Sequence, residues 1–387
     1  MVEYRKAKKC EYEEVTQEAN LIFTVGSDGD YDHRYFQDLL PKLFGDDSVI
    51  DQNLIAVEDG KILALVGGFK NEATVMGHKL PVTGIGNVGV DPSFRRQGFM
   101  KKVMALIDEE CRADGTVMSM LGGQRQRYEH YGYTHANNGI SFSMDMGNLY
   151  RIFGDVNFGH TFRDVKADDD ELLDKIYEDC ERRKAKALRP RDTIYKILCS
   201  WHHIPVAIFD KNGDYAGFLV CGSGRGTIFE MELRGDAGYA QVAFDYSKSI
   251  GNKDLGFDNV GFEEVNKIKE LEPIGCYQLG MGEMFKIYDY RKMLQAYFDL
   301  AASYKKLADG KCSFEIIGFE KVLVTVENNK ATVESFEGDA DIVLPDLVAI
   351  RFFFSSAKNC TNYGFDVPPF VDQWFPLPLS WRSEDNV

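Results

Sequence analysis

One short segment, residues 87–101 (NVGVDPSFRRQGFMK), has the residue types of an anion-binding site in a suitable order. An apolar run ends at Val90, a loop with two arginines follows, and an amphipathic helix is expected from about Gly98. Backbone N–H groups in the first turn of a helix lack intrahelical partners and carry the positive end of the helix dipole. The segment therefore predicts a site for a pyrophosphate-like anion. An ordinary helix start with solvated arginines is the alternative.

Three residues of this loop would serve such a site directly. Gly98 permits close approach of the backbone to a ligand, and Arg95 and Arg96 add fixed positive charge. A second segment, residues 121–133 (LGGQRQRYEHYGY), follows further along the chain and is rich in glycine and tyrosine. Taken together, the two segments are the part of the sequence most able to do chemistry.

The composition limits the classes of function. The chain has 387 residues, 45 Lys+Arg against 61 Asp+Glu, and a formal net charge of -16. Nucleic-acid binding needs a surplus of basic residues, so we expect no nucleic-acid partner, whereas cationic ligands are favoured. Hydrophobic residues make up 44% of the chain, which excludes a disordered protein, and the length predicts two or three domains.

Cysteine and histidine usage indicates a soluble cytoplasmic protein without a metal. The eight cysteines are scattered and form no CxxC pair, as is typical of reduced thiols. His202 and His203 are the only close histidine pair, and no cysteine or acidic residue stands beside them at ligand spacing. No apolar run approaches the length of a membrane helix, and the N-terminus lacks the apolar core of a signal peptide, so we expect no membrane contact.

The elements that must position these segments alternate between helix and strand. This order favours an α/β fold with mixed or parallel sheets covered by helices. In the first part of the chain, periodicity and turn signals predict helices at 11–24, 35–44 and 98–113, a hairpin at 53–66 and strands at 80–90 and 116–121.

The rest of the chain divides into two further parts. Residues 160–285 partly repeat the first plan, with a helix at 170–186, a hairpin at 206–220, a strand at 227–233 and a helix at 238–249. The last part has a helix at 292–307, a hairpin at 320–335, a strand from 341 leading into an aromatic helix, and a tail, 368–387, expected to be extended. We predict domains at 1–150, 151–287 and 288–387.

The two chemical segments together resemble the acetyl-CoA site of the GNAT superfamily of N-acetyltransferases. Those enzymes carry a (Q/R)xxGx(G/A) loop after the fourth strand, here residues 95–100 (RRQGFM). A tyrosine then stands four residues before a Gly-aromatic pair, here Tyr128 before Gly132 and Tyr133. Met100 departs from the general pattern and suits one branch, the enhanced intracellular survival (Eis) family, which the chain resembles over its whole length. That resemblance implies two acetyltransferase-like domains, the second diverged, and a last domain resembling the sterol carrier protein fold.

The resemblance implies acetyl-CoA as cosubstrate and assigns residues to its parts. The pantetheine arm would pair with strand backbone at 88–90, and the pyrophosphate would bind backbone N–H groups at about 96–101. The expected cofactor-binding residues are Val88, Gly89, Val90, Arg95, Arg96, Gln97, Gly98, Phe99, Met100, Lys101, Gly123 and Gln124.

The resemblance also implies a catalytic pair. Tyr128 would protonate the leaving thiolate as general acid; the alternative is a core aromatic among neighbouring tyrosines. The base of the resembled family is the C-terminal carboxylate threaded back into the first domain, which here is that of Val387. This chain ends in SEDNV rather than in an aromatic residue. Glu384 or Asp385 acting through water, or a loose surface tail, are therefore alternatives.

The other two domains have less specific signals. Arg234 stands one place out of register for a cofactor loop, so the second domain is expected to be structural or a wall of the substrate pocket. The aromatic helix at 350–354 either packs its phenylalanines into a core, which we favour, or lines a lipid cavity. The resembled family forms hexamers, so a homo-oligomer is expected.

The leading hypothesis is an acetyl-CoA-dependent N-acetyltransferase that acts on a primary amine of a small polycationic molecule by direct attack on the thioester. The resemblance implies aminoglycoside-like acceptors, while polyamines and lysine side chains are competitors. A different acyl chain is also open, because N-myristoyltransferases likewise pair two such domains. The alternative from another class is a non-catalytic protein that binds a hydrophobic ligand and keeps a vestigial CoA site.

Overall fold

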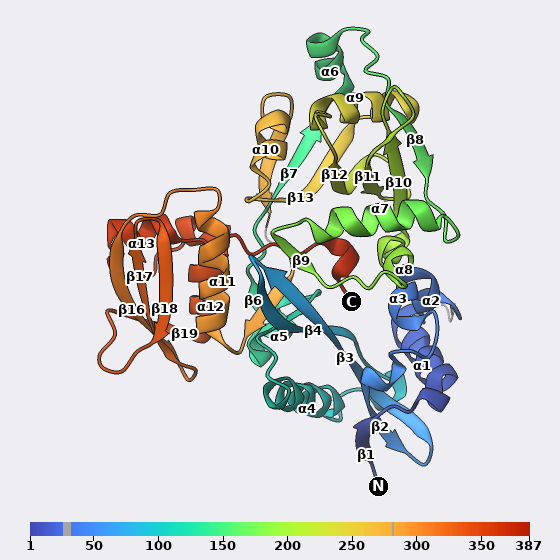
Figure 1. Ribbon diagram of the computed structural model, residues 1–387. Helices are drawn as coiled ribbons and strands as arrows, with labels where there is room; N and C mark the ends of the chain where they lie inside the picture. The colour runs from blue at the N-terminus through green and yellow to red at the C-terminus, as the bar shows by residue number, and fades with distance from the viewer. Residues whose placement is uncertain (26–31, 281) are drawn as a thin grey trace.

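The computed structural model describes residues 1–25, 32–280 and 282–387. Within these residues the strands form three sheets, of eight, seven and four strands, with helices packed on them (Figure 1). The first two sheets contain both parallel and antiparallel pairs, so the α/β prediction with mixed sheets is confirmed. No helix in the described part of the chain is long and apolar enough to cross a bilayer.

The first sheet carries the segments singled out above. Its strands in spatial order are β1 (Glu3–Lys6), β2 (Asn53–Glu58), β3 (Lys61–Val75), β4 (His78–Val90), β5 (Met118–Leu121), β15 (Met284–Ile287) and β6 (Thr134–His135). The predicted hairpin is β2–β3, and both turn residues, Asp59 and Gly60, have positive φ angles of 51° and 79°. Such turns match the right-handed twist of the paired strands, which is why Asp-Gly between two apolar runs predicts a hairpin.

Helices that precede and follow the segment at 87–101 in the chain pack on this sheet. They are α1 (Tyr12–Thr24), α2 (Tyr35–Leu39), α3 (Pro41–Phe44), α4 (Phe99–Ala113) and the short α5 (Arg125–Tyr128). The predicted single helix at 35–44 is wrong, because the chain leaves helical geometry at Leu40 (φ -129°, ψ 62°). Pro41 explains the break, since a proline disfavours the helical conformation of the residue before it.

The second sheet includes one strand that comes from the first part of the chain. Its strands in spatial order are β14 (Cys276–Gly280), β7 (Gly139–Met144), β13 (Leu255–Gly261), β12 (Thr227–Leu233), β11 (Tyr215–Cys221), β10 (Ile204–Phe209) and β8 (Thr161–Asp164). Its helices are α6 (Met146–Phe153), α7 (Asp170–Glu181), α8 (Ile194–Leu198), α9 (Tyr239–Ser249) and α10 (Val265–Leu271). The predicted helix at 170–186 is wrong at its end, because 185–187 form strand β9, which extends the first sheet along β3.

The first two sheets therefore interlock. Strand β7 leaves the first part of the chain for the second sheet, and β15 returns to lie between β5 and β6. The predicted boundaries at 150 and 287 stay predictions, since these exchanged strands tie the two units together near those positions.

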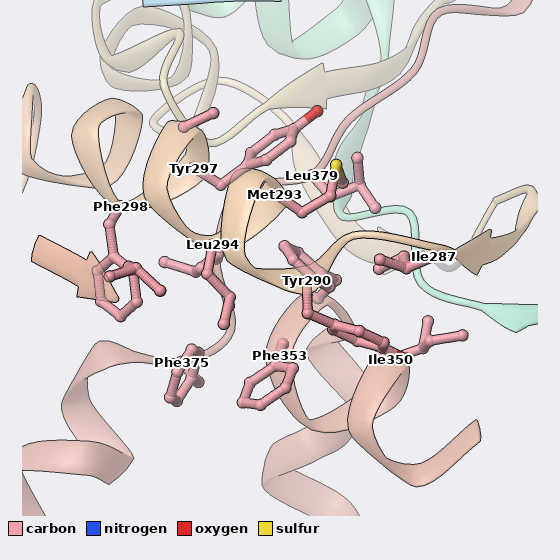
Figure 2. Close-up of a cluster of buried hydrophobic side chains, with 14 of the residues drawn as sticks. Ile287, Tyr290, Met293, Leu294, Tyr297, Phe298, Ile350, Phe353, Phe375 and Leu379 are labelled. Carbon is pink, nitrogen blue, oxygen red and sulfur yellow. The ribbon is translucent and has the colours of Figure 1, made fainter. Parts of the chain in front are cut away.

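The third sheet packs against helices whose buried faces are rich in aromatic residues. Its strands in spatial order are β18 (Lys330–Ser335), β17 (Lys321–Glu327), β16 (Gly310–Ile317) and β19 (Ile342–Pro345), with α11 (Tyr290–Ala302), α12 (Asp346–Phe354) and α13 (Pro369–Trp374) beside them. Tyr290 and Phe298 of α11 point toward Phe353 and Phe375, as Figure 2 shows. The three phenylalanines at 352–354 are fully buried, so their predicted role in the core is confirmed. The helix predicted at 292–307 begins and ends earlier.

The tail returns to the first sheet. The prediction of an extended tail is wrong in part, because 369–374 form α13 and 383–385 form a 3-10 helix. Pro369 explains the first of these, since proline is well suited to the first turn of a helix. Beyond it the chain runs between the first and second sheets, where Figure 1 shows the C-terminus in the middle of the molecule.

Candidate active site

Strands β4 and β5 separate at the centre of the first sheet. Their parallel pairing begins at Val82 with Met118 and ends at Gly84 with Met120. Strand β4 nevertheless continues to Val90, with no described strand paired along its β5 side. An unpaired strand edge presents free N–H and C=O groups, to which an extended ligand can bind as an added strand.

A bulge shapes this free edge. The register of β4 against β3 shifts beside Asn87, whose φ is 41°. The buried Asn87 side chain holds the bulge: its Oδ1 accepts from the Gly67 N–H at 3.1 Å, and its Nδ2 donates to Asn53 Oδ1 at 2.8 Å. A bulge bends a strand and redirects its groups, so Asn87 aims the last residues of β4 away from β5.

A cavity of about 700 Å³ opens along this edge and over the start of α4. Nine of the predicted cofactor residues line it: Val88, Gly89, Val90, Arg95, Arg96, Gly98, Phe99, Met100 and Lys101. The predicted Gln97, Gly123 and Gln124 are exposed and do not line it. The structure adds residues that sequence reasoning missed, namely Ile22, Phe23, Phe94, Arg127 and Tyr131. Arg127 and Tyr131 lie in the second chemical segment, whereas nothing in the sequence marks Ile22 or Phe23.

The loop before α4 has the geometry of an anion site. Gly98 caps the helix with φ 86°, a left-handed conformation that favours glycine, and no side chain caps that end of the helix. Asp91 shapes the start of the loop by accepting from the Ser93 N–H at 2.7 Å, and Lys61 pairs with it. The first-turn N–H groups of this 15-residue helix are therefore left for a ligand, beside two exposed arginines.

Tyr128 lies at the end of α5, under the glycine-rich turn after β5. The residue is 7% exposed, and its ring lies 3.1 Å from the position that a Cβ on Gly123 would take. Burial raises the pKa of the Tyr128 hydroxyl, which keeps it protonated at neutral pH. Its neighbour Tyr133 is more deeply buried and bonds Ser119 at 2.7 Å, while Tyr131 faces the cavity.

The last residue of the sequence, Val387, lies where β4 and β5 separate. Its carbonyl carbon is 3.1 Å from the position that a Cβ on Gly86 would take, and its methyl groups are within 2.8 Å of that position on Gly84. Any side chain at these two glycines would displace the tail. The glycines of β4 thus make the room that the end of the chain occupies.

Buried polar contacts hold the tail in this place. Arg189 donates to both carboxylate oxygens of Asp385, at 2.8 and 2.9 Å, and also binds Glu230. Lys42 donates to the backbone oxygen of Glu384 at 2.5 Å. Asp385 is therefore committed to an ion pair, and the fully buried Glu384 carboxylate lies beside His203 of the second unit, 3.6 Å away.

In the second unit two neighbouring strands also separate, but a side chain occupies the position at the start of the following helix where an anion would bind. Strand β12 pairs with β13 only at Thr227 and Ile228, then continues to Leu233 paired with β11 but with no described strand on its β13 side. At the start of α9, Glu270 accepts from the Ala240 N–H at 3.3 Å, where a phosphate would otherwise bind. Arg234 is held by Asp179 at 2.7 Å and is not free for a ligand.

Comparison with known proteins agrees with this geometry. Residues 3–136 match the acetyltransferase (GNAT) domain family, so the first unit is a GNAT acetyltransferase domain and the protein is an acyltransferase.

Three solved structures resemble the chain over almost its whole length. They are a protein of Enterococcus faecalis described as a probable N-acyltransferase (16% identity, TM-score 0.68, 98% of this chain and 99% of that chain), a GCN5-related N-acetyltransferase of Kribbella flavida (15%, 0.66, 100% and 98%) and Eis1 of Mycobacterium abscessus (13%, 0.65, 100% and 100%). At such identities the likeness shows the fold alone. No curated protein matches the chain by sequence.

Proposed function

We propose that the protein transfers the acetyl group of acetyl-CoA to a primary amine of a small polycationic molecule, such as an aminoglycoside-like compound or a polyamine. The observation that carries this proposal is the position of Val387, which brings the end of the chain to the point where β4 and β5 separate, two residues along β4 from the part of the strand that lines the cavity. A carboxylate there would meet an amine that approaches a thioester lying along β4.

The cosubstrate would lie along the residues that line the cavity. The backbone at 88–90 offers the free edge for the pantetheine arm, and the first turn of α4 offers N–H groups for the pyrophosphate. Arg95 and Arg96 add positive charge, and both are exposed at the mouth. Gln97, Gly123 and Gln124 belong to the same proposal as neighbours of the cavity.

Two groups of this chain would move the protons. The Val387 carboxylate would accept a proton from the acceptor's ammonium group, and the neutral amine would then attack the thioester carbonyl, so that the C–N bond forms and the C–S bond breaks. Tyr128 would then protonate the departing thiolate. The Tyr128 hydroxyl is protonated at neutral pH, as any phenol with an ordinary or raised pKa is, so it has a proton to donate to the thiolate. The second proton of the nitrogen is released as the amide forms and restores the hydroxyl of Tyr128 after it has acted.

The charge of the protein supports a cationic acceptor. The net charge of the chain is -16. A field of this sign raises the local concentration of polycations and slows the approach of anions. Lysine side chains of peptides belong to the same chemical class and remain competitors.

Assembly, location and the last unit are further parts of the proposal. We propose that residues 288–387 share the sterol carrier protein fold, that chains assemble as a homo-oligomer, with a hexamer as the expected state, and that the protein acts in the cytoplasm. The filled aromatic core around Phe353 supports a structural role of the last unit rather than a lipid-binding one. Light scattering on the purified protein would measure the oligomeric state.

The direct test is release of CoA thiol from acetyl-CoA with a panel of aminoglycosides, polyamines, lysine peptides and a blank without amine. We expect amine-dependent release with at least one polycationic class. If acetyl-CoA binds but no amine of the panel causes CoA release, the proposal is contradicted and a protein with a vestigial CoA site is favoured.

A further inference from the structure

Glu283, just before β15, lies at the separation of β4 and β5, beside the end of β5, whereas Val387 lies against β4. Its Oε2 is 3.0 Å from the position that a Cβ on Gly122 would take. Val387 lies against Gly86 in the same way. Gly122 and Gly86 each stand two residues beyond the last paired residues of β5 and β4. The Glu283 carboxylate and the end of the chain therefore flank the opening between the strands.

This carboxylate forms no ion pair with a described residue, although the His135 ring, which bonds the neighbouring Gly282 carbonyl at 2.6 Å, lies near enough to act on its charge. Its Oε1 accepts a hydrogen bond from Asn386 Nδ2 at 2.9 Å. Within the described residues, its Oε2 accepts no hydrogen bond, and no lysine, arginine or histidine nitrogen lies within ion-pair distance. Glu283 is half-buried, and burial raises the pKa of its carboxyl group. A carboxylate partly removed from water without a cation is a costly arrangement, which a cationic ligand would relieve.

The other acids near the tail differ from Glu283 in pairing or in place. Asp385 and Glu264 are ion-paired. Glu384 and Glu263 each keep one carboxylate oxygen without a hydrogen bond, but Glu384 is fully buried beside His203, and Glu263 lines a separate small pocket with Arg382. Glu283 combines an oxygen without a hydrogen bond with a position next to the proposed acceptor site. This contrast selects it among the carboxylates that surround the tail.

We propose that Glu283 is a specificity-determining residue, whose Oε2 accepts a charge-assisted hydrogen bond from a second ammonium group of the acceptor. The inference rests on the proposed function, because it requires an amine acceptor at the opening between the strands. One amino group is acetylated beside Val387 while the other stays charged against Glu283. Acceptors with two amino groups are then preferred over the same skeleton with one.

The test compares 1,5-diaminopentane with 5-aminopentan-1-ol, which keeps the chain length and replaces one amine with a neutral hydroxyl. For wild type and Glu283→Gln, kcat/KM is measured for each acceptor by CoA release. We expect the variant to lose on the order of tenfold or more of the diamine preference, through KM, because it loses a hydrogen bond between two charged groups; tenfold corresponds to about 1.4 kcal/mol. Turnover of the amino alcohol and KM for acetyl-CoA should stay within about twofold.

Two further variants make the outcome decisive. Gln at 283 can still accept from Asn386, so an equal loss for both acceptors would show a structural role and overturn the inference. Glu283→Asp keeps the charge and should retain part of the preference, even if Glu283→Gln folds poorly. Glu334→Gln, an exposed carboxylate on β18, is the matched control. A diamine preference that survives in Glu283→Gln contradicts this inference alone. Absence of CoA release by wild type with every amine contradicts the proposed function as well.

Discussion

Tyr128 is at once a buried aromatic and the candidate acid, and its surroundings allow both. Its ring fills the space under Gly123, a packing role that the sequence alternative anticipated. The same burial raises the pKa of its hydroxyl, which holds its proton at neutral pH as an ordinary phenol also does. Burial therefore accounts for the packing of this residue but does not by itself make its hydroxyl a stronger acid.

We expect Tyr128→Phe to lower kcat by on the order of 10²-fold or more, because general acid catalysis contributes about 10²–10⁴-fold, while KM for acetyl-CoA changes little. Tyr133→Phe is the matched control: it removes a buried hydroxyl that bonds Ser119 but lies outside the proposed chemistry. Steady-state kinetics of both variants decide the matter. A Tyr128→Phe enzyme within a few-fold of wild type would remove Tyr128 from the mechanism.

At the scale of elements, α4 and the loop before it form the part of the site with the strongest structural definition. Gly98 has φ 86° at the N-terminus of α4, and Gly115 has φ 70° just past its C-terminus. A Cβ at either position would meet open space. The two glycines thus carry similar backbone strain on substitution, but only Gly98 faces the cavity.

This pair gives a controlled prediction. Gly98→Ala and Gly115→Ala should each lower the free energy of unfolding by about 1–2 kcal/mol, since an L-residue is strained in the left-handed region. Only Gly98→Ala should raise KM for acetyl-CoA, because its methyl group would stand where the pyrophosphate approaches. Chemical denaturation and steady-state kinetics measure the two effects. Equal KM values in the two variants would argue against the proposed anion site.

The elements best predicted from the sequence are those with local signals. The hairpins at 53–66, 206–220 and 320–335 are found with their turns, and Asn328 and Asn329 both take positive φ as such a turn requires. Strands β9 and β15 were missed because they are short and pair with residues distant in sequence. Their pairing can be seen only in the folded sheet, because segments of three or four residues are too short to show the alternating hydrophobic pattern of a strand.

At the scale of the whole molecule, the site depends on all parts of the chain. The free edge comes from β4, the tail returns from the third unit, and Arg189 of the second unit fixes the tail through Asp385. The motif at 87–101 predicted residues that line one cavity, because that part of the cavity wall is continuous in sequence. Glu283 could not be found this way, since its role depends on the tail and on the strand exchange that inserts β15 beside β5.

Arg189→Met should therefore affect both stability and activity. It leaves the Asp385 carboxylate buried without its cation, while Glu230 keeps Arg183, and removing one member of a buried ion pair costs about 3–5 kcal/mol. We also expect kcat to fall in protein that is still folded, because the tail loses its main contact. Arg191→Met, which removes a partly exposed ion pair, should cost about 1 kcal/mol or less and leave kcat unchanged. Denaturation combined with kinetics measures both. Lost stability with an unchanged kcat would separate the tail from catalysis.

The central claim is that the carboxylate of Val387 acts as the base at the opening between β4 and β5. The most direct measurement is kcat of a chain extended by one glycine after Val387, with the amine that the panel selects. The extra residue moves the carboxylate by up to about 3.5 Å, well beyond hydrogen-bond tolerance. We predict a loss of on the order of 10²-fold in kcat with acetyl-CoA binding retained. An extended chain as active as wild type would contradict the claim.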